Sequence, residues 1–370
     1  MKRHRLRELG ISIGFGTPGL QNKLTDVSGV LVGHTTLIQG HGKLIPGEGP
    51  IRTGVTAILP HDGNLYEGSV VAAVHVINGF GKATGLAQLQ ELGRVETPIL
   101  ITNTLNVGLV QDAVTQYMIE ENPAAGISTS TPNPIVGECH DGYLNDAQGR
   151  HVRQKHVYDA IRTAGKAVIE GCVGAGTGMI AYGCKSGVGT ASRCLPKKDG
   201  GYMVGCLTVP NCGRGGDLII AGTLVRRLFA ALAPSIRPKP PASEGGSIIV
   251  ILATDAPLSS RQLARIARRA TIGIGRTGSV ISHGSGDFVI AFSTAYQEVR
   301  SSAPLTVQRE QLRDRYLTPL FAAAVEATEE AILNALCMAT SMAGRDDHIV
   351  EALPLDIVHH LSATEHGKSD

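Results

Sequence analysis

Eight short apolar segments recur along the chain, and each is bounded by glycine, proline, asparagine or aspartate. They cover residues 53–61, 68–79, 97–104, 133–142, 178–187, 201–211, 247–256 and 287–294. Apolar runs of this length that end at turn-forming residues are typical of β-strands. Because a chain with so many closely spaced strands must bury their apolar faces, we expect sheets that stack on one another and carry helices outside.

Helical spacing of apolar residues is clear in three segments. In residues 259–275, arginines occupy one helical face and the other face carries Leu263, Ile266, Ala267 and Ala270. We expect Ser259 or Ser260 to cap this helix at its N-terminus. The other two segments are residues 156–168 and 317–343. These few helices do not alternate regularly with the strands, so the sequence predicts an α/β sandwich of two stacked sheets.

Charge and cysteine content exclude several classes of protein. The 34 Lys and Arg nearly balance the 32 Asp and Glu, so we expect no nucleic-acid partner. The chain contains no run near the roughly 18 apolar residues that a membrane-spanning helix needs, so we expect no membrane partner. Seven cysteines without a C-x-x-C pattern fit neither a zinc ribbon nor a disulfide framework. We therefore predict reduced thiols and a cytoplasmic location.

A glycine-rich stretch over residues 171–193 raises the possibility of nucleotide binding. The dinucleotide fingerprint requires G-x-G-x-x-G directly after a strand and at the start of a helix. Here the third glycine comes one residue early and a strand-like segment follows. These glycines are better explained by tight turns or by close approach of the backbone to a substrate.

The bond between Gly246 and Ser247 follows a proline-rich lead over residues 233–246 and precedes an apolar run. One interpretation is a surface loop that enters a buried strand. The other is a cleavage point, because Gly246 has no Cβ to obstruct attack on its carbonyl by the Ser247 hydroxyl. Cleavage would create an α-amine with a pKa near roughly 7.7–8.0, which could serve as the base for that hydroxyl.

Several longer stretches carry a resemblance to a known family. They are NKLTDVSGVLVGHTT, NTLNVG, PIVGECHDGYLND, GAGTGMIAYGCKSGVGTASR, TVPNCGR, GGSIIVILATDAPL, RIARRATIGIGRTG and SHGSGDFVIAFST. With these, the chain resembles the β-peptidyl aminopeptidases, which include the L-aminopeptidase/D-Ala esterase-amidases. The resemblance runs from residue 22 to about residue 294, and the helical C-terminal part carries little of it.

The resemblance implies a self-processing hydrolase formed by one catalytic domain, residues 1–370, that is cut into residues 1–246 and 247–370. It implies a four-layer αββα sandwich similar to the N-terminal nucleophile hydrolases. Family members release N-terminal residues, including D- or β-amino acids, from peptides, amides or esters that have a free amino terminus. They use no metal or cofactor, and we expect a homotetramer of processed protomers.

The catalytic residues of the family match four positions of this chain. Ser247 matches the nucleophile. Ser285 and Asp287 match a serine and an acidic residue that support the nucleophile, although some relatives carry glutamate where this chain has Asp287. Asn211 matches an asparagine that stabilises the oxyanion, an interaction worth about 2.7–4 kcal/mol where single donors have been removed. The residues around Asn211 depart from the usual pattern, which affects the expected shape of the pocket.

Three further positions are assigned around the substrate. Tyr143 matches a tyrosine near the reacting carbonyl. Glu138 is the first candidate for binding the free ammonium group of the substrate, and Asp141 is the second, because a partly buried carboxylate recognises a charged terminus by pairing with it.

Two other functions remain open from the sequence. The first is an acyltransferase similar to ornithine acetyltransferase, although that family processes before a threonine and this chain has serine. The second is an unprocessed binding or scaffold protein, which would appear as one intact band of 38.7 kDa on a denaturing gel.

Overall fold

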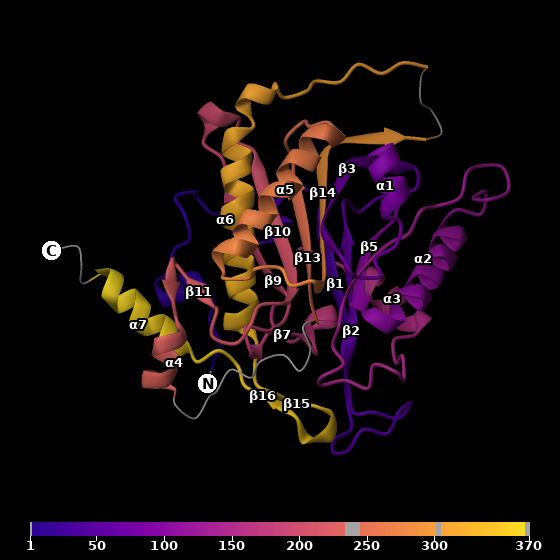
Figure 1. Ribbon diagram of the computed structural model, residues 1–370. Helices are drawn as coiled ribbons and strands as arrows, with labels where there is room; N and C mark the ends of the chain where they lie inside the picture. Colours follow the sequence, from indigo (N-terminus) through magenta and orange to yellow (C-terminus); the bar gives the residue numbers. More distant parts are fainter. Residues whose placement is uncertain (1, 234–244, 301–304, 367–370) are drawn as a thin grey trace.

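The computed structural model describes residues 2–233, 245–300 and 305–366, and its centre is a pair of stacked β-sheets (Figure 1). In spatial order, the four-stranded sheet consists of β1 (Leu31–Gln39), β2 (Ile51–Leu59), β5 (Ile99–Asn103) and β6 (Ile135–Cys139). The six-stranded sheet consists of β4 (Arg94–Val95), β3 (Gly68–Gly79), β14 (Gly284–Val299), β13 (Gly245–Thr254), β10 (Met203–Asn211) and β9 (Gly189–Cys194).

Helices cover the outer face of each sheet (Figure 1). On the four-stranded sheet these are α2 (Val107–Glu121) and α3 (Gln154–Arg162), and on the six-stranded sheet α5 (Ser260–Arg276) and α6 (Thr318–Met338). The expected four-layer αββα sandwich is therefore confirmed. The remaining elements are α1 (Leu86–Leu92), α4 (Arg226–Leu232), α7 (Leu355–His366), β7 (Ile180–Ala181), β8 (Cys184–Lys185), β11 (Ile219–Ile220), β12 (Thr223–Leu224), β15 (Met342–Ala343) and β16 (Ile349–Val350).

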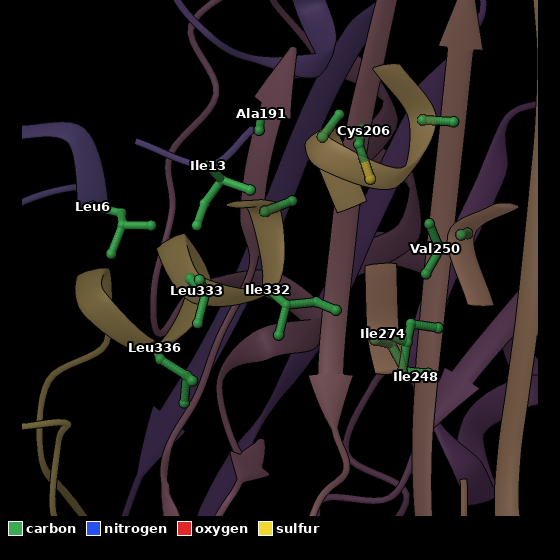
Figure 2. Close-up of a cluster of buried hydrophobic side chains, with 14 of the residues drawn as sticks. Leu6, Ile13, Ala191, Cys206, Ile248, Val250, Ile274, Ile332, Leu333 and Leu336 are labelled. Atoms are coloured by element: carbon green, nitrogen blue, oxygen red, sulfur yellow. The ribbon is translucent and has the colours of Figure 1, made fainter. Parts of the chain in front are cut away.

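Strand β13 lies inside the six-stranded sheet, parallel to β14 and antiparallel to β10. Successive side chains of a strand point to opposite faces. Ile248 and Val250 accordingly pack against the α5 and α6 layer, as Figure 2 shows with Ile274 and Ile332. The odd-numbered Ile249 belongs to the core between the two sheets. The run from Ile248 to Ala253 is apolar, as expected of a strand with both faces buried.

Most expected elements are present, with differences at their ends. Ser259 caps α5, since its hydroxyl accepts from the Gln262 backbone N–H and the Gln262 side chain accepts from the Ser259 N–H. The helix expected over residues 317–343 ends at Met338, because Ala339 is extended and β15 then pairs with β16. The strand expected over residues 178–187 is instead the short hairpin β7–β8.

The hairpin forms because its turn is left-handed. Tyr182 has φ 53° and Gly183 has φ 75°, and positive φ at both central residues is the geometry of a two-residue β-hairpin turn. The proline-rich lead over residues 233–246, interpreted as a surface loop or a cleavage segment, falls mostly on residues 234–244, which lie outside the described part of the chain. Within the described ranges, no helix is long and apolar enough to cross a bilayer.

Candidate active site

Ser247 lies near the start of β13, where the two neighbouring strands of its sheet bring Asn211 and Gly286 beside it. The serine is only 2% exposed. Ser247 and Ile249 are two residues apart on one strand, so their side chains point to the same face. Ile249 belongs to the core between the sheets, so the Ser247 side chain points toward the four-stranded sheet. There its Oγ accepts from the His140 backbone N–H at 3.3 Å and from Asn211 Nδ2 at 3.4 Å. Two donors, one directly after β6 and one at the end of β10, therefore converge on one hydroxyl oxygen.

The carboxamide of Asn211 is held in one orientation. Its Oδ1 accepts from the Ile180 backbone N–H at 3.0 Å, at the start of the β7–β8 hairpin. Because the oxygen end of the amide already has a donor, the NH₂ end is the one that faces Ser247. The amide can therefore donate to negative charge that develops beside the Ser247 oxygen.

Ser285 and Asp287 lie two residues apart on β14 and share a face of that strand. Both are buried, and Ser285 Oγ donates to Asp287 Oδ1 at 2.7 Å. Burial raises the pKa of Asp287 to about 6, against the opposing effect of hydrogen bonds from Ser285 and the Ile248 backbone. Ser285 also lies beside Gly246, because a Cβ added there would be 3.1 Å from Ser285 Oγ.

The segment that carries Ser285 is anchored by an asparagine that the sequence interpretation did not single out. Asn78 on β3 donates from Nδ2 to the backbone carbonyls of Ser282 and His283 at 3.2 and 2.9 Å. It also donates to the carbonyl of Ser285. These bonds fix the backbone around the start of β14, so they determine the position of the Ser285 side chain.

Glu138 is buried at the end of β6. Its Oε1 accepts from the Lys82 backbone N–H at 3.0 Å, and its Oε2 accepts from the Thr104 hydroxyl. A Cβ added to Gly286, the residue that pairs with Ser247, would lie 3.6 Å from this Oε1. The carboxylate and the Ser247 strand are therefore neighbours.

Asp141 is buried, as Glu138 is. It is 1% exposed, and its Oδ1 accepts from Asn145 Nδ2 at 3.0 Å. Burial raises its pKa to about 7, and the charge of Glu138 acts in the same direction. Its Oδ2 has no hydrogen-bond partner among the described residues. Its assignment as the second candidate for binding the substrate ammonium stays a prediction.

Tyr143 lies apart from this group of hydrogen bonds. Its ring stacks on His348, with centroids 4.3 Å apart and planes at 11°. Its backbone carbonyl is 2.9 Å from His348 Nδ1. Within the described residues, no hydrogen bond joins Tyr143 to Ser247, so its assignment near the reacting carbonyl stays a prediction.

Two backbone groups and one side chain at the site were missed from the sequence, the backbone groups because no side-chain type marks them. The backbone N–H groups of His140 and Ile180 take part through their position in the fold. The thiol of Cys139 was also missed. It is fully buried next to Ser247, donates to the Val209 carbonyl at 3.1 Å, and has a pKa raised well above its usual value by burial. An inert thiol thus lines one side of the Ser247 hydroxyl.

Comparisons with known proteins identify the family of this chain. The sequence matches peptidase family S58 over residues 22–350. It is 42% identical to the β-peptidyl aminopeptidase BapA of Sphingosinicella microcystinivorans over 361 residues, which is 95% of this chain and 89% of that protein.

Two solved structures share the fold over nearly the whole chain. A Burkholderia sp. β-aminopeptidase is 40% identical with a TM-score of 0.89, over 99% of this chain and 100% of that one. The L-aminopeptidase D-Ala-esterase/amidase of Ochrobactrum anthropi is 37% identical with a TM-score of 0.88, over 99% of each chain. The latter is described as a prototype of the serine aminopeptidases with a variant of the Ntn hydrolase fold. The chain therefore belongs to peptidase family S58, and it is a hydrolase of the serine aminopeptidase type with this variant of the N-terminal nucleophile fold.

Proposed function

We propose that this protein cleaves its own Gly246–Ser247 bond and then uses Ser247 as the nucleophile of an aminopeptidase. The observation that carries the proposal is the convergence of the His140 N–H and the Asn211 amide on Ser247 Oγ. Both donors meet at the residue that follows Gly246, where an added Cβ would lie 3.1 Å from Ser285 Oγ. Residues 1–246 and 247–370 would remain one catalytic domain after the cut.

Self-cleavage proceeds by an acyl shift within the chain. Ser247 Oγ forms a bond to the Gly246 carbonyl carbon, its proton passes to the Ser247 nitrogen, and the C–N bond breaks to leave an ester. Water then hydrolyses this ester, which frees the Gly246 carboxylate and the Ser247 hydroxyl and α-amine. Ser285 and Asp287 pair with Gly246 and Ile248, on the face of β13 opposite the Ser247 side chain, so we propose that they act on the Gly246–Ser247 peptide and not on the Ser247 hydroxyl itself.

Turnover repeats the same chemistry on a substrate carbonyl. The new α-amine takes the proton of Ser247 Oγ as the oxygen attacks, and it returns the proton to the leaving amine. The carbonyl oxygen of the substrate becomes the oxyanion. We propose that the Asn211 Nδ2 group and the His140 N–H, which both donate to Ser247 Oγ in the structure, donate to it. Such donors are effective because they are already oriented before charge develops.

Glu138 is proposed to bind the ammonium group of the substrate, which makes the enzyme an aminopeptidase rather than a general amidase. Its two oxygens hold one hydrogen bond each, and an ionised carboxylate has about four acceptor positions, so it can accept more. Peptides, amides and esters with a free amino terminus are the proposed substrates, and the names of the relatives favour β-amino acids at that terminus. A cytoplasmic homotetramer of processed protomers is the proposed assembly.

The decisive experiment is the chain composition of the purified protein. We expect two bands on a denaturing gel, with a smaller chain that begins Ser-Ile-Ile-Val. Ser247→Ala should remain intact and inactive, because both reactions require the hydroxyl. A small chain with another first residue, or an active intact chain, would contradict the proposal. Light scattering on the processed protein tests the tetramer.

A further inference from the structure

Lys185 is a buried cation that the proposed chemistry does not use. Its side chain is fully buried at the end of the β7–β8 hairpin. Its Nζ donates to the backbone carbonyls of Gly176, Met179 and Ser186 at 3.3, 2.9 and 2.5 Å. It forms no ion pair with any residue that the structure describes. Burial lowers the pKa of this amine, but its three carbonyl acceptors require three N–H donors, which only the charged ammonium has, so the geometry favours the cation.

One of these three carbonyls belongs to the peptide that orients Asn211. The Met179 carbonyl and the Ile180 N–H are parts of a single planar peptide unit, and in a trans peptide the two groups point in opposite directions. On one side the carbonyl accepts from Lys185 Nζ, and on the other the N–H donates to Asn211 Oδ1 at 3.0 Å. The ammonium and the carboxamide are therefore connected through one rigid plane.

We propose that Lys185 is a positioning residue, which acts through the Met179–Ile180 peptide to orient and polarise the Asn211 amide for oxyanion stabilisation. The inference rests on the proposed roles of Asn211 and Ser247. The ammonium draws electron density toward the Met179 oxygen, which makes the Ile180 N–H a stronger donor. That donor polarises the Asn211 carbonyl, which in turn makes Nδ2–H a stronger donor, because linked hydrogen bonds strengthen one another.

Other contacts hold the hairpin when the ammonium is removed. The Met179 carbonyl also accepts from the Ser186 N–H at 2.9 Å, and the Tyr182 N–H donates to the Cys212 carbonyl at 3.0 Å. The Lys185 backbone N–H donates to the Glu351 carbonyl at 2.7 Å, independently of the side chain. The backbone path of the hairpin therefore does not depend on the Lys185 side chain alone. What a variant at this position loses is the positive charge that contacts the Met179 carbonyl.

The test compares Lys185→Met with wild type, using a free-amine peptide amide and giving kcat per mole of small chain. Loss of a whole oxyanion donor costs about 10²–10³ in kcat, so loss of its orientation and polarisation should cost about 10- to 100-fold. KM should change less than about threefold, since the interaction is made in the transition state. Lys23→Met is the matched control, because Lys23 Nζ also donates to a backbone carbonyl, that of Val168 at 2.7 Å.

A double-mutant cycle shows whether the effect passes through Asn211. In an Asn211→Ala background, Lys185→Met should lower kcat by less than a further factor of about two, because the amide on which Lys185 is proposed to act is then absent. An equal loss in both backgrounds, an unchanged kcat, or an equal loss in Lys23→Met overturns the inference. If Asn211→Ala itself keeps wild-type kcat, the proposed function of that residue fails instead. Where Lys185→Met is insoluble, Lys185→Gln replaces it, and a kcat equal to wild type then overturns the inference.

Discussion

Replacing Gly246 by alanine should slow self-cleavage without harming turnover. The added methyl would lie 3.1 Å from Ser285 Oγ and 3.4 Å from the Asn211 carbonyl oxygen. Gly246 is not among the glycines with positive φ, so alanine adds no backbone strain of that kind. The cost comes from the 3.1 Å contact, which displaces the Ser285 hydroxyl by a few tenths of an ångström.

The size of the effect follows from what that hydroxyl does. Ser285 Oγ is bonded to Asp287 at 2.7 Å, and a hydrogen bond to a charged group is worth about 1.5–3 kcal/mol. Loss of about half of that bond, or about 0.75–1.5 kcal/mol, in the transition state of cleavage would slow processing by about 3- to 12-fold, since 1.4 kcal/mol is a factor of ten. After the cut, residue 246 is the end of another chain, so kcat per mole of small chain should equal wild type.

The assay is a gel time course of the precursor after cell-free synthesis, followed by kinetics on the processed fraction. Gly275→Ala is the control, because a Cβ at that helical position meets no atom within 4 Å. It should process at the wild-type rate. Wild-type processing of Gly246→Ala, or a lowered kcat in its processed fraction, would refute the reasoning about Ser285.

Three further predictions concern the carboxyl groups of the site. Glu138→Gln should lower kcat/KM for free-amine peptides by about 30-fold or more while it leaves self-cleavage intact, because a truncated charged partner costs about 2–5 kcal/mol. An unchanged ratio of rates on free and N-acetylated substrates would contradict this. Asp287→Asn should slow self-cleavage on the same gel assay, since the amide presents a weaker acceptor to Ser285, and Ser293→Ala serves as a buried-serine control on the same strand. Asp141→Asn should change how the free energy of unfolding depends on pH. In wild type the folded pKa of this carboxyl is about 7, so between about pH 4 and 7 the folded state binds more protons than the unfolded state and stability falls as pH rises. Urea denaturation should show this fall in wild type, with Asp141 contributing at most about 1.4 kcal/mol per pH unit. The variant should show a smaller fall, because Asp287, with its pKa raised to about 6, acts in the same direction; equal slopes in both would refute the prediction.

The strands were predictable from the sequence because their signal is local. Apolar runs bounded by turn residues mark β2, β3, β5, β6, β10, β13 and β14. Helix α2 was missed, although Val110, Val114 and Met118 recur in it at helical spacing and are buried. The β7–β8 hairpin was interpreted as one strand because the turn at Tyr182 has no glycine at its first central position.

The site was predictable only in part, because its geometry depends on strand order. Ser285 and Asp287 share a face by the two-residue period alone. That Ser247 would lie beside Asn211 requires the register of β10 against β13, which no local pattern specifies. The resemblance to a family supplied those residues together, whereas the backbone donors at His140 and Ile180 required coordinates.

The order of strands in the six-stranded sheet has a consequence for how the two chains would be held after a cut at residue 246. Strands β13 and β14 would belong to the smaller chain, yet they lie between β3 and β10 of the larger one. The smaller chain would also supply α5 and α6, the whole helical layer over that sheet. Separation of the chains would then require the sheet to open on both sides of β13–β14, so dissociation and global unfolding would be the same event. Dilution alone should not release either chain. The two chains would fold and unfold as one unit. Residue 246 is therefore a suitable boundary for producing the enzyme from two separately encoded fragments.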